Sequence, residues 1–180
     1  ALPDDATRAT AGKDSALGGV SNVSTDDYDI RFILEVYNAA GELVKDRMVK
    51  SGDDTSATFN FRLIPGRDYK FVVWADFVAN GANCDLHYDT SDLANIQLIG
   101  EQNLNDESRD AYTAICDVEN FSSAKGIPAI ELKRPLGKLR VVTTDVKDMY
   151  TLLPEDVTVV YTTPIYTVFN AYASDVDKTQ

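Results

Sequence analysis

Residues 67–77, with the sequence RDYKFVVWADF, are the stretch that decides the fold class of this chain. Every second position in it is aromatic or aliphatic, namely Tyr69, Phe71, Val73, Ala75 and Phe77. A period of two is typical of a β-strand with one buried face. Residues 28–36 and 57–63 show the same alternation, so the sequence predicts an antiparallel β-sandwich with Phe71, Val73 and Phe59 in its core.

Short turns join the predicted strands of the N-terminal half. The strands are expected at about 28–37, 42–49, 56–63 and 68–78, and the turns at 38–41, 51–54 and 64–67. A parallel crossover needs roughly a dozen residues or more between strands. The connections are shorter than that, so we predict an antiparallel meander or part of a Greek key.

Residues 79–126 are rich in Asn and Asp and read as a long excursion between strands. Short helices are predicted from Thr90 or Ser91 to Ile96 and near 107–112. Strands are expected again at 128–134, 137–144, 156–162 and 165–170, with a helical turn at 146–153 that Asp145 caps and Pro154 ends. The prediction is an all-β chain of about seven or eight strands with one or two short helices.

The N-terminal residues 1–24 are small and polar and lack a periodic apolar pattern. They are expected to form a flexible tether from which a targeting signal has been removed, or to mark an arbitrary boundary. Residues 25–180 are expected to form one β-sandwich domain.

Charge excludes several classes of partner. The chain has 17 basic and 29 acidic residues, a formal net charge of −12 and a pI of about 4.4. Nucleic acid and anionic membrane surfaces attract clustered Lys and Arg, so neither is an expected partner. No apolar run approaches the roughly 20 residues that span a bilayer.

No catalytic, cofactor-binding or metal-binding residue is predicted. The single histidine, His87, has Cys84, Asp85 and Asp89 nearby, but no nucleophile motif accompanies it, and a surface histidine is expected. Cys84 and Cys116 fit no metal motif; two free thiols are favoured over a disulfide.

Two further sets of residues have both a functional and a structural interpretation. The acidic pairs 26–27 and 53–54 and the group Asp85, Asp89 and Asp92 could bind calcium, but their spacing does not match an EF-hand, which favours solvated loops. Trp74 could stack on a sugar, yet it is expected to fill the second side of a strand that is covered on both faces.

Several ordered segments resemble the fimbrillin-like proteins of Bacteroidetes, which are pilins and fimbrial anchor and tip lipoproteins. The segments are LIPGRDY at 63–69 leading into VVWAD at 72–76, RDAYTA at 109–114, ELKRPLGKL at 131–139 and YTVFN at 166–170. Together they span roughly residues 28–170 of the chain.

The resemblance implies a transthyretin-like, seven-stranded N-terminal sandwich of a lipoprotein that is exported to the outer membrane and cell surface. It also implies assembly with other fimbrial subunits by donated β-strands, without enzymatic activity or a cofactor. The second sandwich domain and the lipidated cysteine of that family would be missing from this chain, so membrane attachment is expected only through a removed N-terminal lipid anchor.

Two other functions remain open from the sequence. One is a surface lipoprotein module that binds a glycan or a host protein through an exposed aromatic patch of Tyr88, Tyr112 and Phe121. The other is an enzyme, for which no pair of carboxylates stands out among the acidic residues.

Overall fold

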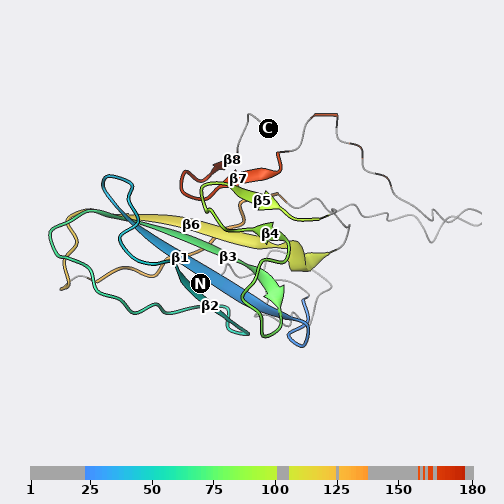
Figure 1. Cartoon of the computed structure of the whole chain (residues 1–180), viewed down its shortest axis with the longest axis horizontal. Helices are drawn as coiled ribbons and strands as arrows, with labels where there is room; N and C mark the ends of the chain where they lie inside the picture. Colours follow the sequence, from blue (N-terminus) through green and yellow to red (C-terminus); the bar gives the residue numbers. More distant parts are fainter. Residues whose placement is uncertain are drawn as a thin grey trace, which may run out of the picture.

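The structure, a computed structural model, describes residues 23–100, 106–124, 126–137, 158, 160, 162–163 and 166–176. Over these residues the chain forms two antiparallel four-stranded sheets and one short 3-10 helix (Figure 1). The predicted all-β, antiparallel sandwich is confirmed. None of the described helical segments is long and apolar enough to cross a membrane.

Sheet A has the strand order β2-β1-β3-β6 and contains the two longest strands. Its members are β1 (Tyr28–Asn38), β2 (Met48–Gly52), β3 (Tyr69–Ala79) and β6 (Ala111–Val118). Strands β1 and β3 pair along their whole length, from Tyr28 opposite Ala79 to Asn38 opposite Tyr69. The strand predicted at 68–78 is confirmed as β3, but it is a central strand with both faces buried and not a strand with one buried face.

Sheet B has the strand order β4-β5-β7-β8 and is built from much shorter strands. They are β4 (Tyr88–Asp89), β5 (Ile96–Leu98), β7 (Val168–Asn170) and β8 (Asp175–Val176). The 3-10 helix η1 (Glu107–Arg109) precedes β6. Figure 1 shows sheet B over one side of the long strands of sheet A, while the connection that follows β2 runs along the opposite side.

The sheet-B face of sheet A, which packs against sheet B, carries Ile33, Val72, Trp74 and Ala111. These side chains contact Tyr88, Leu93, Ile96, Phe169 and Ala171. The Trp74 ring is fully buried and lies edge-on to Tyr88, with 5.3 Å between ring centroids. Trp74 thus fills the second side of a strand covered on both faces, as expected.

The opposite face of sheet A carries the other alternate side chains of the same strands. We call it the strip face, because residues 56–63 lie on it. Its fully buried members include Ile30, Val36, Phe71, Phe77 and Tyr112. Half-buried apolar side chains from residues 57–63 and 127–130, together with the buried Leu132, cover this face. Phe71 and Val73 are core residues as predicted, whereas Phe59 is only half-buried.

Two predicted strands on the strip face do not form. Residues 56–63 alternate between exposed and half-buried side chains but belong to no ladder. With the residues that the structure describes, the segment 128–134 forms one bridge, in which Thr113 and Lys133 exchange two backbone hydrogen bonds of 2.8 and 2.9 Å. The predicted alternation of inward and outward side chains in residues 56–63 is correct. Such alternation does not indicate whether the backbone pairs with another strand.

Other predicted boundaries need correction. The strand expected at 42–49 begins only at Met48, and Leu43 forms an isolated bridge with Tyr37. The helix expected up to Ile96 is absent, because Ile96 starts β5, and the helix near 107–112 is reduced to η1. Strand β6 was missed altogether, and the strand expected at 165–170 is confirmed only as β7.

Some predictions lie wholly or mostly outside the described residues. These are the tether at 1–24, the strands at 137–144 and 156–162, and the helical turn at 146–153.

Candidate functional site

A buried ion pair stands at the centre of the polar contacts on the sheet-B face. Arg31 of β1 lies directly opposite Asp76 of β3 in the antiparallel register. Its guanidinium donates from Nε to Asp76 Oδ1 over 2.9 Å and from Nη2 to Oδ2 over 2.6 Å. The residues are 2% and 1% exposed, so this is a two-pronged, charge-assisted pair in the core.

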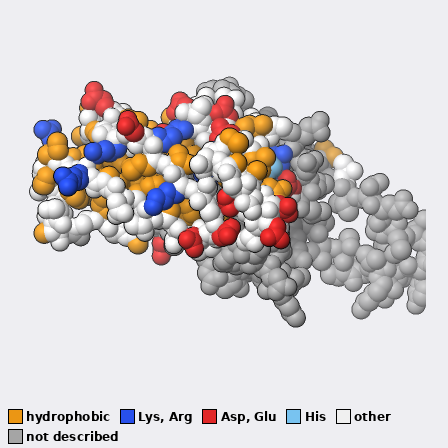
Figure 2. Space-filling view, turned by 60° about the horizontal axis from the view of Figure 1, so that its bottom comes forward, with side chains coloured by type: hydrophobic (Ala, Val, Ile, Leu, Met, Phe, Trp, Pro, Cys, Tyr) orange, Lys and Arg blue, Asp and Glu red, His pale blue; other side chains and the backbone are white. Residues whose placement is uncertain are grey.

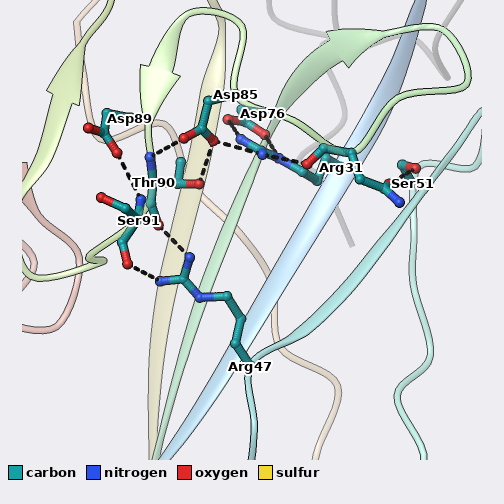
Figure 3. Close-up of polar contacts among 9 residues, drawn as sticks. Arg31, Arg47, Ser51, Asp76, Asp85, Asp89, Thr90 and Ser91 are labelled. Carbon is teal, nitrogen blue, oxygen red and sulfur yellow. Dashed lines mark hydrogen bonds and ion pairs between the residues drawn. The ribbon is translucent and has the colours of Figure 1, made fainter.

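The same guanidinium also holds the loop that follows β3 (Figure 3). Arg31 Nη1 donates to the carbonyl oxygen of Asn83 over 3.0 Å and pairs with Asp85 Oδ1 at 2.8 Å. Burial acts to lower the pKa of Arg31, but hydrogen bonds and charge from Asp76 and Asp85 outweigh it and raise that pKa. The cation is therefore permanent, and it fixes the start of the loop.

A second arginine holds the far end of this loop. Arg47 donates from Nη1 to the Thr90 carbonyl over 2.6 Å and from Nη2 to the Ser91 carbonyl over 3.1 Å. Its Nε donates to Glu35 Oε1 over 2.7 Å. Asp85 completes the arrangement by accepting from the backbone N and the Oγ1 of Thr90 at 3.0 and 2.7 Å. We call Arg31, Arg47 and these partners the arginine clamp, which immobilises loop 83–91.

His87 is buried, so the expectation of a surface histidine was wrong. Its Nε2 lies 2.7 Å from Ser108 Oγ, and that hydroxyl donates its proton to Asp106 Oδ1. Nε2 must therefore carry a proton and donate it to Ser108, since the only hydroxyl proton is already used. The direction of this hydrogen bond is the reverse of that in a catalytic triad, in which the histidine accepts the proton of the serine hydroxyl.

The environment of His87 disfavours its charged form. Burial is the main cause that lowers the pKa of His87, and the positive charge of Arg109 adds to it against the opposing effect of Asp106. Asp106 itself has a lowered pKa, because hydrogen bonds from Ser108 outweigh the effect of burial. The His87–Ser108–Asp106 chain thus ties the segment before β4 to η1 as a structural contact.

The carboxylates weighed as calcium ligands make other contacts. Asp85 belongs to the arginine clamp, while Asp89 accepts from the Ser91 backbone N and Asp92 from the Ala94 backbone N, at 3.0 and 2.8 Å. Within the described ranges no three metal-ligating side chains come together. Cys84 and Cys116 are both free thiols.

The aromatic patch considered for ligand binding does not exist. Tyr88 is buried against Trp74 and donates its hydroxyl to the Arg109 carbonyl over 2.5 Å. Tyr112 is buried in the other core cluster, and Phe121 is half-buried edge-on to Tyr69, 6.1 Å between centroids. The three rings contact different partners and present no common surface.

The most unusual backbone lies in residues 56–63, which we call the strip. Ala57, Phe59, Phe61 and Leu63 point toward the strip face of sheet A, and Phe61 lies 6.3 Å from Phe71 between centroids. No peptide N–H of the strip donates a hydrogen bond to any part of the chain that the structure describes. Its carbonyls receive one side-chain bond, from Lys50 Nζ to Thr58 over 2.6 Å. The side chains of the strip alternate as in a β-strand, but its backbone belongs to no sheet.

A rigid corner fixes the end of the strip. The Tyr69 hydroxyl accepts from the Ile64 N–H over 3.1 Å and donates to the Ile64 carbonyl over 3.2 Å. Gly66, at φ +78°, donates to the Phe121 carbonyl, and Phe121 donates to the Arg67 carbonyl, each over 2.8 Å. A tyrosine hydroxyl that binds backbone a few residues upstream resembles the tyrosine corner of Greek-key sandwiches.

These features define an all-β sandwich module. The chain belongs to DUF6562, a family of unknown function, whose model matches residues 2–180. No curated protein and no solved structure matches it significantly.

Proposed function

We propose that the chain is a non-enzymatic structural or anchoring module that assembles with other protein subunits by β-strand addition. The observation that carries this proposal is the strip. Within the described ranges none of its N–H groups donates and only its Thr58 C=O accepts a hydrogen bond, while alternate side chains already pack on a core. A strand from a partner would supply the missing backbone hydrogen bonds, which is how β-augmentation gains affinity.

The edges of sheet A are less suited to this role. On β6, Thr113 already bonds to Lys133, which interrupts that edge. On β2 the strand is only five residues long, and short edge strands are a common protection against unwanted pairing. The strip offers a longer run of eight residues, in which only the Thr58 carbonyl already has a hydrogen bond, from Lys50 Nζ.

The cellular setting of the proposal comes from the resemblance to fimbrillin-like proteins. On that basis the partners are other fimbrial subunits, and the chain is exported as a surface lipoprotein of the outer membrane. A net charge of −12 is compatible with solubility outside the cell.

The test uses the purified 180-residue chain and a ten-residue peptide of alternating Val and Thr. Hydrogen exchange should show new protection of amides 56–63 on peptide binding, and fluorescence anisotropy should show that binding persists at 1 M salt, where the Debye length is about 3 Å. A peptide of the same sequence with N-methylated alternate amides is the matched control. Equal binding of the control, or protection elsewhere, would contradict strand addition at the strip.

The arginine clamp favours a second candidate function, a surface module that binds a glycan or a host protein through loop 83–91. Binding loops are commonly held by a rigid scaffold, and this loop exposes Cys84 and Ser91 between its two arginine anchors. The test is binding of the chain to a glycan array. Loss of that binding in a Ser91→Trp variant of unchanged thermal stability would favour this function.

A further inference from the structure

We infer that the strand received by the strip carries a carboxylate opposite Arg62. This inference rests on the proposed function, because it describes the chemistry of the partner at the same site. Arg62 is exposed on the outward side of the strip, next to the inward-facing Phe61 and Leu63. A strand that pairs with the strip therefore places an outward side chain beside the Arg62 guanidinium.

Arg62 differs from four of the six arginines that the structure describes because it has no carboxylate partner within the described ranges. Four other guanidinium groups contact carboxylates within 3.3 Å: Arg31, Arg47, Arg109 and Arg134. Arg62 makes no such contact with any residue that the structure describes. In a chain with 29 acidic residues, its cation is left available near the C-terminal end of the strip.

A second cation lies beside the same backbone. Lys50 Nζ binds the Thr58 carbonyl and stands 5.7 Å from the centroid of the Phe59 ring. Figure 2 shows Lys and Arg side chains interspersed with hydrophobic ones over the left half of the visible surface, where a few acidic side chains lie at the upper rim, while most Asp and Glu side chains lie further right. The strip of this acidic protein therefore has two cations, those of Arg62 and Lys50.

The position of the cation sets a condition on the partner. A charged side chain on a free edge protects it from pairing with unrelated strands. Opposite charges across paired strands stabilise the pair, and like charges destabilise it. Arg62 should therefore reject basic strands and select strands with alternating apolar residues and an acidic outward residue.

The experiment compares three ten-residue peptides of alternating Val and Thr whose central outward residue is Thr, Glu or Lys. For the wild-type chain at low salt, the Glu peptide should bind about two- to fivefold more tightly than the Thr peptide and the Lys peptide correspondingly more weakly. Arg62→Glu should reverse this order. Arg67→Glu, with the same charge change in the turn beyond the strip, should leave the order intact. Thermal melts establish that both variants are folded.

The outcomes distinguish a failure of the carboxylate inference from a failure of strand addition. Equal affinity of the three peptides for the wild-type chain and for Arg62→Glu would overturn the carboxylate inference but leave strand addition standing. Reversal of the order by both variants would overturn it too, because the selectivity would then come from overall charge. Absence of binding by all three peptides overturns both proposals.

Discussion

The two faces of sheet A are built from alternating residues of the same strands, yet they are covered in different ways. The sheet-B face is covered by short paired strands and by loop 83–91, which the arginine clamp attaches through side chains to β1. The strip face is covered by apolar side chains of residues 56–63 and 127–132, and within the described ranges the backbone of residues 56–63 makes no hydrogen bond to another backbone group.

This difference separates two contributions to packing that usually occur together in a sandwich, namely apolar burial and directional polar contacts. Burial of apolar side chains is the main contribution that positions the strip, since its alternation follows the face beneath it, and polar contacts are confined to the Lys50–Thr58 bond and the corner at Ile64. Directional polar contacts are what make the opposite cover specific and rigid. We therefore expect the sheet-B face to dominate global stability and the strip to open locally.

The largest expected effect follows removal of Arg31. Arg31→Met leaves Asp76 buried without its partner, which should lower the free energy of unfolding by about 3–5 kcal/mol. Urea denaturation measures the change. The double variant Arg31→Met/Asp76→Leu should recover most of the loss, because no buried charge remains. A loss below about 1 kcal/mol in the single variant would show that the clamp is not an anchor.

Matched truncations compare the sheet with the strip that covers it. Phe71→Ala in β3 should cost about 3–5 kcal/mol, as expected for a fully buried phenylalanine. Phe59→Ala in the strip should cost only about 1–2 kcal/mol, because its side chain is half-buried and the strip can collapse into the space. Equal costs in chemical denaturation would mean that the strip is as firmly packed as the sheet.

Hydrogen exchange should resolve the same contrast without any substitution. Amides of β1 and β3 are expected to exchange only through global unfolding, because each strand is central or fully paired. Amides 57–63 should exchange through local opening that costs only about 0–1 kcal/mol, since they lack acceptors. Strong protection of the strip in the free chain would contradict the absence of backbone partners.

The smallest effect concerns pH and His87, the only histidine of the chain. Because its pKa is lowered in the folded state, the unfolded chain binds a proton first as pH falls. The stability contribution is complete above the unfolded pKa of about 6.5 and decreases as the pH drops below it. His87→Gln keeps a donor for Ser108 but cannot titrate, so the difference between the urea midpoints of wild type and variant should change between pH 7.5 and 5.5. A constant difference would show that His87 does not titrate differently on folding.

The sequence predicted the central strands well because their alternation is long and uninterrupted. In β1 and β3 the period of two places residues such as Phe32 and Phe71 on one face and Ile33 and Trp74 on the other. The strip shows where this signal ends. Its alternation is equally regular, but periodicity describes which side of a chain is buried and is silent about backbone partners.

The polar contacts were harder to predict because they join residues far apart in the sequence. Arg31 and Asp76 each interrupt an apolar strand, and opposite charges at such positions were a usable signal for a cross-strand pair. Nothing local indicated that Arg47 binds carbonyls more than 40 residues away. Strand β6 was missed because the polar residues before it, which form η1, resemble the start of a helix.

The arginine clamp has a consequence for how loop 83–91 can change. Three of its contacts are to the carbonyl oxygens of Asn83, Thr90 and Ser91, which every amino acid possesses. Side chains at Asn83 and Ser91 can therefore be exchanged without removing those anchors, whereas Asp85 and Thr90 use their side chains. Loop 83–91 is therefore suited to grafting or diversification. Its backbone is held by Arg31 and Arg47, which lie outside the loop, and not by the side chains that would be varied.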